Sequence, residues 1–231
     1  MTQVFDTGDV LLEWSSLRVT GEDAHEFLQG QITQNVSAAV GGAWTFILEP
    51  DSTVLCLGWL HSSGEDFFID VPVHIANTIL LRLKRFVLRS KVAIEVTTCD
   101  QPVLLTMSEA FEALFPVGFP EGKSTPHSYG ELWIRQAVSF DKGCYTGQEL
   151  VGRLDSRGAP VPFSIVRLHS ISLESTMELI RQGPQSTKQE VLSGFTNDSG
   201  TYCFALLHRS VLGDQSLLVA SSVEILPVAI A

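Results

Sequence analysis

Short stretches rich in hydrophobic residues occur along the first half of the chain and predict β-strands. They are residues 11–19, 45–49, 54–60, 66–71, 92–96 and 102–107. Residues rich in β-branched and aromatic side chains, bounded by turn formers, are typical of strands. The turns at 50–53 and 63–64 predict that the three strands between 45 and 71 form a hairpin or meander.

A three- and four-residue spacing of apolar positions predicts two helices. The first covers residues 24–36, with Phe27, Leu28 and Ile32 on one face, and begins after the capping residues 20–23. The second covers residues 73–91, where the apolar positions are Ile75, Ile79, Leu83, Phe86 and Val87. Strands and helices in mixed order, without strict alternation, predict the α+β class.

The pattern changes in the second half of the chain. Six prolines and glycines within residues 116–130 predict a long loop. From Pro160 onward, short alternating runs separated by polar turns predict a small all-β barrel or sandwich. We therefore expect two regions, 1–157 and 158–231, of which the first could consist of two interleaved subdomains.

Composition limits the classes of function. The 231 residues carry a net charge of -11, which argues against direct binding of nucleic acid or of a membrane surface. The four cysteines lie far apart, without a CxxC pair or metal-ligand spacing, so no metal site is expected. The start of the chain lacks the pattern of a signal peptide and no apolar run is long enough for a membrane span, so we expect a cytoplasmic protein with free thiols.

Basic residues gather in the second predicted helix. Arg82, Arg85 and Arg89 form a stripe beside its apolar face. Such a stripe could meet the carboxylates of a polyglutamyl tail or of an acidic partner, but a solvated helix flank is the more common structure. Gln29 and Gln31 could line a pocket, or only end the first helix. No Ser-His-Asp arrangement can be nominated from the spacing of the six histidines.

The segment DKGCYTGQE, residues 141–149, carries the strongest candidate chemistry. Thr146 and Glu149 have the spacing of a capping box, which predicts a helix from Gly147. Cys144 would then lie just outside the positive end of that helix, and Lys142 would point to the same side of an extended chain. Both effects favour a reactive thiolate. The alternative is that Cys144 is a small buried filler.

Residues 142–149, KGCYTGQE, match all eight positions of the signature K-G-C-[FY]-x-G-Q-E, so the chain resembles the YgfZ family. That family is related to the T-protein, the aminomethyltransferase of the glycine cleavage system. Supporting similarities are GEDAHEFLQGQITQNV at 21–36, AVSF at 137–140, and Arg153 and Gly158 after the signature.

The resemblance implies a T-protein-like (GcvT-like) fold that holds tetrahydrofolate, or a one-carbon derivative of it, in a central cavity. It also implies a cytosolic role in the assembly or repair of iron-sulfur client proteins, such as radical tRNA-modifying enzymes. Cys144 and Lys142 carry over as candidate catalytic residues. The candidate cofactor-binding residues are Tyr145, Gln148, Glu149 and Arg153.

The sequence departs from the wider superfamily in two places. Cys56 and Leu57 stand where aminomethyltransferases have acidic residues, which argues against aminomethyl transfer. Leu114 and Pro116 stand where YgfZ proteins commonly have the Arg and Glu of R-x-E-A-G, whose glutamate binds the pterin. Two hypotheses follow: a folate-binding protein that uses Cys144 in iron-sulfur maintenance, or a non-catalytic scaffold or binding module with the same fold. The residues leave open which client is served and whether the chain is an oligomer.

Overall fold

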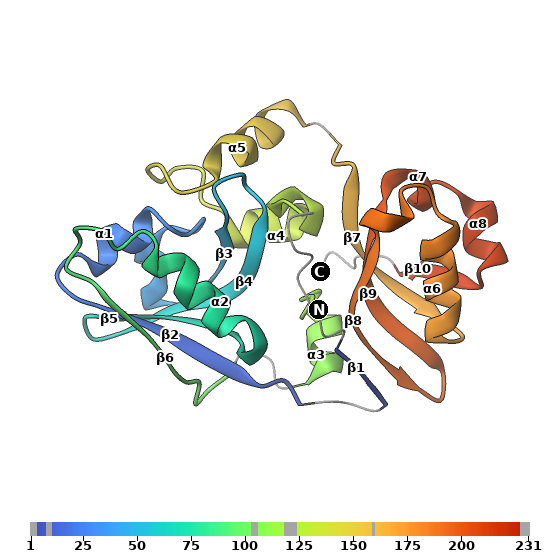
Figure 1. Ribbon diagram of the computed structural model, residues 1–231, viewed down its shortest axis with the longest axis horizontal. Helices are drawn as coiled ribbons and strands as arrows, with labels where there is room; N and C mark the ends of the chain where they lie inside the picture. The colour runs from blue at the N-terminus through green and yellow to red at the C-terminus, as the bar shows by residue number, and fades with distance from the viewer. Residues whose placement is uncertain (1–3, 8–10, 103–105, 118–123, 159, 227–231) are drawn as a thin grey trace.

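Two five-stranded sheets form the frame of the protein (Figure 1). The computed structural model describes residues 4–7, 11–102, 106–117, 124–158 and 160–226. In the first sheet the strand order is β3 (Ala43–Leu48), β4 (Val54–Ser63), β5 (Asp66–Pro72), β2 (Trp14–Thr20) and β6 (Ala93–Thr98), and all neighbours are antiparallel. The predicted meander is therefore confirmed as β3–β4–β5.

Helices α1 (Ala24–Gln29) and α2 (Val73–Lys84) pack against the first sheet. Ala76, Ile79 and Leu83 of α2 are buried, as the apolar spacing predicts. On the paired strands β3 and β4, the aromatic rings of Trp44 and Trp59 meet edge to face, with ring centres 5.2 Å apart. The 3₁₀ helices η1 (Val36–Val40) and η2 (Pro126–Tyr129) and the helix α4 (Glu131–Ala137) complete this part of the core.

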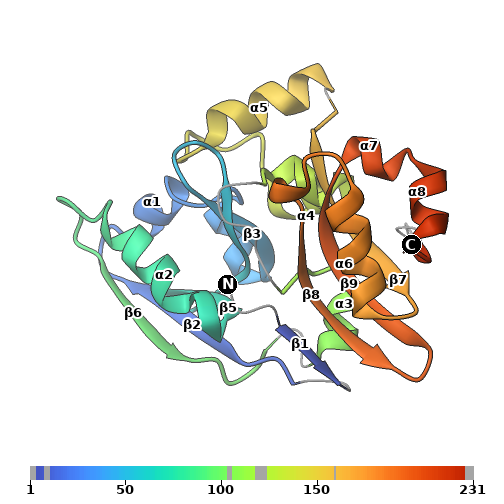
Figure 2. The ribbon, with the colours of Figure 1, turned by 45° about the vertical axis from the view of Figure 1, so that its right-hand side comes forward.

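The second sheet combines both ends of the chain. Its order is β1 (Val4–Thr7), β8 (Glu190–Asn197), β9 (Gly200–His208), β7 (Phe163–Ser170) and β10 (Val223–Leu226). Strand β1 runs parallel to β8 at the edge of the sheet (Figure 2). The boundary predicted between 157 and 158 stays a prediction, but the second sheet takes its edge strand from the first region.

Helices also cover the second sheet. They are α6 (Leu173–Gln182), α7 (Arg209–Leu212) and α8 (Gln215–Ala220), with the short η3 (Ser186–Lys188) before β8. Helix α3 (Met107–Glu112) packs on β8 and β9, so that α3 and α4 lie between the two sheets (Figure 1). Helix α5 (Gln148–Arg157) leads from the first sheet to β7.

The α+β class is confirmed, with differences in detail. The C-terminal region is an open sheet with helices, not the all-β barrel that we expected. Thr176, Leu179 and Ile180 repeat at helical spacing and are buried in α6, behind the capping Ser172. Residues 216–220 belong to the run 216–225, which we expected to be a strand, but they lie in α8, which the Asp214 side chain caps.

Two predicted helices are shorter than expected. The first ends at Gln29, because Gly30 turns the chain and Ile32 bridges to Ile47 of β3. The second ends at Lys84 and continues as turns.

Two predictions about the middle of the chain are also corrected in part. Of the strand predicted for 102–107, residues 103–105 lie outside the described part, and Met107 begins α3 after a capping box formed by Thr106 and Glu109. Of the loop predicted for 116–130, residues 118–123 lie outside the described part, and η2 occupies 126–129.

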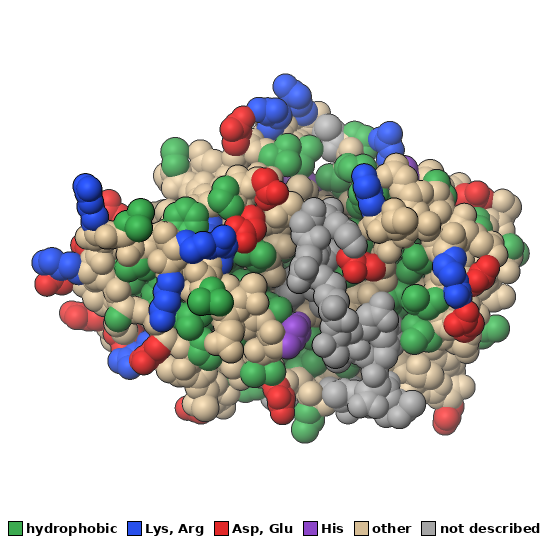
Figure 3. Space-filling model, viewed as in Figure 1, with side chains coloured by type: hydrophobic (Ala, Val, Ile, Leu, Met, Phe, Trp, Pro, Cys, Tyr) green, Lys and Arg blue, Asp and Glu red, His purple; other side chains and the backbone are tan. Residues whose placement is uncertain are grey.

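Charges are interspersed on the face that Figure 3 shows, where Lys and Arg side chains lie among Asp and Glu side chains. Among the described residues, no helix combines the length and apolar character needed to cross a membrane.

Candidate functional site

The signature segment, residues 142–149, lies between α4 and α5 and is fixed to the chain that follows α1. The Ser139 N–H donates to the Thr33 carbonyl at 3.0 Å, just before the signature. Within it, the Thr146 N–H donates to the Gly30 carbonyl at 3.0 Å. The Thr33 hydroxyl also donates to the carbonyl of Ala137, at the end of α4, at 2.6 Å. These contacts hold the signature segment at both ends.

Lys142 adds a third attachment. Its ammonium donates to the carbonyls of Ile32 at 2.7 Å and Gln34 at 3.0 Å. It also lies 5.1 Å from the centre of the Tyr145 ring, a cation–π distance. Burial lowers the pKa of Lys142 to about 8 and raises the pKa of Tyr145 to about 12. The structure therefore gives Lys142 a holding role towards residues 32–34.

Helix α5 begins one residue later than predicted. Its N-cap is Gly147, and the predicted capping box of Thr146 and Glu149 is not formed. The Thr146 hydroxyl instead donates to the Gly30 carbonyl at 3.3 Å. The Gln148 side chain accepts the Tyr145 N–H at 3.1 Å and so closes the turn.

Gly147 is required by its surroundings. Its φ of +84° is left-handed, and an added Cβ would lie 2.7 Å from the Glu49 carbonyl oxygen. The Gly147 carbonyl in turn accepts the Ser52 hydroxyl at 2.6 Å. The start of α5 thus fits against the turn between β3 and β4.

Cys144 is exposed, which contradicts the alternative of a buried filler. It borders a hollow of about 350 Å³, which we call the signature hollow, whose lining includes Phe140, Lys142, Cys144, Tyr145, Gln148 and Glu149. It also borders a second hollow, with His25, Glu26 and Gln29. In the described part of the chain, no hydrogen bond joins the Cys144 thiol to Lys142, so the predicted activation of the thiol by this lysine stays a prediction.

Five of the six candidate site residues meet in the signature hollow. The exception is Arg153, which lies one turn further along α5 and pairs with Glu149 at 2.5 Å. Both side chains are more than half exposed, so the pair contributes little stability and leaves both charges accessible.

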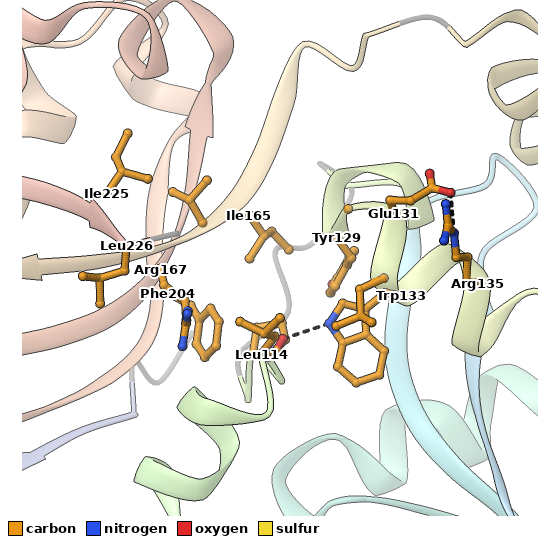
Figure 4. Close-up of a pocket in the computed structure, with 14 residues that line it drawn as sticks. Leu114, Tyr129, Glu131, Trp133, Arg135, Ile165, Arg167, Phe204, Ile225 and Leu226 are labelled. Atoms are coloured by element: carbon orange, nitrogen blue, oxygen red, sulfur yellow. Dashed lines mark hydrogen bonds and ion pairs between the residues drawn. The ribbon is translucent and has the colours of Figure 1, made fainter. Parts of the chain in front are cut away.

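A more apolar hollow, larger than the signature hollow, lies between the two sheets (Figure 4). This inter-sheet hollow has a volume of about 450 Å³. Leu114 and Pro116, the residues at the family's Arg and Glu positions, line it together with Trp133 of α4. Ile165 of β7 and Phe204 of β9 line it from the second sheet. Sequence comparison pointed to 114 and 116, but could not show which residues of the second sheet face them.

The arginine stripe is solvated in part, because Arg85 and Arg89 are exposed but Arg82 is not. Arg82 is buried, and its guanidinium donates to the Gln31 side chain and, at 2.5 Å, to the Leu48 carbonyl. Burial lowers its pKa to about 10. Gln31 accepts this bond, so it has the structural role that we favoured. Arg85 is exposed and pairs with Glu49 at 2.9 Å.

Sequence reasoning missed a cluster of Ser16, His61 and Asp70. The buried Asp70 carboxylate accepts the Ser16 hydroxyl, and its other oxygen lies 3.0 Å from His61 Nε2. Serine and histidine thus both contact the carboxylate, unlike a catalytic triad, where the imidazole contacts the hydroxyl. Burial and the nearby Asp70 charge raise the pKa of Cys99 beside it. The register of β2 and β5, which pairs Ser16 with Asp70, was not readable from the sequence.

Comparison with known proteins identifies the relatives of this chain. No family model matches it. An uncharacterized protein of Haemophilus influenzae is 28% identical over a region covering 64% of this chain and 69% of the relative. The tRNA-modifying protein YgfZ of Photorhabdus laumondii is 27% identical, with coverage of 64% and 66%. That of Klebsiella pneumoniae is 32% identical, with coverage of 53% and 34%. In sequence, the chain is similar to the YgfZ proteins.

The fold agrees with this relationship. The aminomethyltransferase T of the glycine cleavage system from Bartonella henselae superposes with a TM-score of 0.52 at 11% identity, covering 90% of this chain and 80% of that one. The T-protein-like fold is therefore confirmed. The matched region spans about two thirds of the Photorhabdus YgfZ and about one third of the Klebsiella YgfZ.

Proposed function

We propose that this YgfZ relative binds a folate in the inter-sheet hollow and uses Cys144 to assist the assembly or repair of iron-sulfur clusters in the cytoplasm. The observation that carries the proposal is the signature hollow, in which one short segment presents an exposed cysteine among five of the six candidate site residues. The names of the YgfZ relatives support tRNA-modifying enzymes as the first clients to test.

The inter-sheet hollow fits part of a folate. Its apolar lining suits the faces of aromatic rings, and its volume lies in the range of small-molecule sites. A pterin also presents paired N–H donors, which a carboxylate would satisfy. Leu114 and Pro116 offer no such group, so the contact common in the family cannot form there. The remaining carboxylate in the described lining is that of Glu131, which is 71% exposed and pairs with Arg135.

The second hypothesis is a scaffold or binding module that keeps the fold without chemistry at Cys144. The missing pterin carboxylate favours it. Aminomethyl transfer is the least supported activity, because Cys56 and Leu57 are fully buried in the core as well as non-acidic. Neither side chain could reach a ligand.

Complementation tests the proposal. Cells that lack their own copy of the gene would receive the wild-type chain, Cys144→Ser or the control Cys99→Ser, and the product of an iron-sulfur-dependent tRNA-modifying enzyme would be measured. We expect the wild type and Cys99→Ser to restore the modified nucleoside and Cys144→Ser to fail. Restoration by Cys144→Ser would leave the scaffold hypothesis, and no restoration by the wild type would contradict the iron-sulfur role.

A further inference from the structure

The inter-sheet hollow has walls that suit a flat ring. Leu114, Pro116 and Trp133 come from the α3–α4 side, and Ile165, Phe204 and Leu226 from the second sheet. Figure 4 shows Phe204 and Leu226 on one side of the hollow and Trp133 on the other. The Trp133 ring is held in place, because its indole N–H donates to the Leu114 carbonyl at 2.9 Å. Fixed aromatic and aliphatic walls favour an aromatic ligand.

A cation that is mostly shielded from solvent lies in the same wall. The Arg167 side chain is only 11% exposed, and its guanidinium lies 5.2 Å from the centre of the Phe111 ring. It donates to the Phe111 carbonyl at 3.3 Å, and the Glu112 carboxylate is 3.7 Å away. Because Glu112 is 80% exposed, water screens that pair. An anionic group in the hollow would gain a charge-assisted hydrogen bond from a guanidinium that is already desolvated and oriented.

Carboxylates are scarce in the described lining of this hollow. Glu131 is the acidic residue there; its side chain is 71% exposed and pairs with Arg135 at 2.9 Å, so water screens its charge. The lining therefore offers cations and apolar surface, in a chain whose net charge is -11. A ligand with a carboxylate fits this balance, whereas a ligand that must donate paired N–H groups to an anion does not.

We propose that the inter-sheet hollow selects a flat aromatic ring bearing a carboxylate, which Arg167 binds, and that it does not read the hydrogen-bond donors of a pterin. The inference rests on the proposed function, because a folate carries such an aromatic acid in its p-aminobenzoylglutamate half. It deepens that function by stating which half of the ligand gives the affinity.

Calorimetry with three probes tests the inference. The probes are folic acid, its analogue with a methyl group in place of the 2-amino group, and p-aminobenzoylglutamate. We expect folic acid and the analogue to bind within about threefold of each other, because the lost donor has no partner. Removing an N–H donor that has no acceptor in the protein leaves the affinity unchanged. Removing a donor that is paired with an anion weakens binding tenfold or more, at about 1.4 kcal/mol per factor of ten.

Two arginine variants test whether Arg167 binds the carboxylate of the ligand. Arg167→Met keeps the packing on Phe111 and should weaken all three probes by about tenfold or more. Arg181→Gln is the control, because Arg181 is exposed and pairs with Glu174 and Glu178 on α6, outside the lining. It should leave binding unchanged.

The outcomes separate the two claims. If the 2-methyl analogue binds more than about tenfold more weakly than folic acid, the pterin donors are read, and the inference fails while folate binding stands. Equal effects of Arg167→Met and Arg181→Gln would also overturn it. If p-aminobenzoylglutamate binds through Arg167 and folic acid does not bind, the inference about the aromatic acid stands, and the proposal that the protein binds a folate is wrong. No binding by any probe would contradict both.

Discussion

The ammonium of Lys142 donates to the carbonyl oxygen of Ile32 at 2.7 Å, across 110 positions of sequence. A second bond from the same ammonium reaches Gln34. The lysine of the signature therefore ties the cysteine segment to the chain beside β3. We infer that these two hydrogen bonds of Lys142 position Cys144.

Removing this tie should destabilise the protein. Lys142→Met would leave two carbonyls without their donor, and the expected loss is about 1–3 kcal/mol in the free energy of unfolding. Urea denaturation measures it. Lys91→Met is the control, because Lys91 is exposed and pairs with Glu22, so it should cost less than about 1 kcal/mol. Equal effects of the two variants would show that Lys142 anchors nothing.

The same lysine makes stability depend on pH. Its pKa is about 8 in the folded protein and has an ordinary value of 10.5, because burial disfavours the charged form. Between these values the unfolded chain binds more protons, so the free energy of unfolding rises with pH. This contribution is complete above 10.5 and is lost as the pH falls through about 8. A neutral amine still donates, so the bonds to the carbonyls can persist.

Comparing wild type with Lys142→Met from pH 7 to 11 isolates this contribution. The difference in unfolding free energy should rise in favour of the wild type across that window. A difference that stays flat or falls with pH would contradict the burial of the ammonium.

The glycine that caps α5 and a glycine inside α5 should respond oppositely to alanine. Gly147→Ala places a Cβ 2.7 Å from a backbone oxygen at a left-handed φ, so the protein should lose several kcal/mol of stability or fail to fold. Gly152→Ala meets nothing within 4 Å inside α5 and should gain about 0.5–1 kcal/mol. Thermal unfolding separates the two. A tolerated Gly147→Ala would mean that α5 does not start against the Glu49 turn.

Adding a carboxylate to the inter-sheet hollow should change ligand selection. Pro116→Glu supplies an acceptor for pterin donors, so folic acid should bind about tenfold more tightly, while the 2-methyl analogue should gain less. Calorimetry on the two ligands measures the difference. Unchanged affinity for folic acid would mean that residue 116 does not face the pterin.

Much of the first sheet could be predicted, because β3, β4 and β5 are short runs rich in apolar residues and are joined by short turns. The signature was equally readable, since eight adjacent residues carry it. What the sequence could not show are contacts between distant segments. In the sequence, Arg82 cannot be told apart from its exposed neighbour Arg85. Only the structure shows that Arg82 donates to the carbonyl of Leu48. The spacing of Thr146 is that of a helix cap, but its hydroxyl donates instead to the carbonyl of Gly30.

The C-terminal region shows a related difficulty. Residues 216–225 are apolar enough for a strand, yet Asp214 caps the first half as a helix and only Val223–Leu226 pairs with β7. Short apolar runs do not distinguish helix from strand by pattern alone. The parallel pairing of β1 with β8 depends on residues almost 190 positions apart, which no local signal reports.

The central claim is that the signature segment is held so that Cys144 stands open for reaction. Iodoacetamide labelling of the native protein, followed by mass spectrometry of the four cysteine peptides, tests it most directly. We predict that Cys144 reacts more than about tenfold faster than partly buried Cys99, and that buried Cys56 and Cys203 react only when the protein opens. Labelling of Cys144 at the rate of Cys99 or slower would contradict the claim.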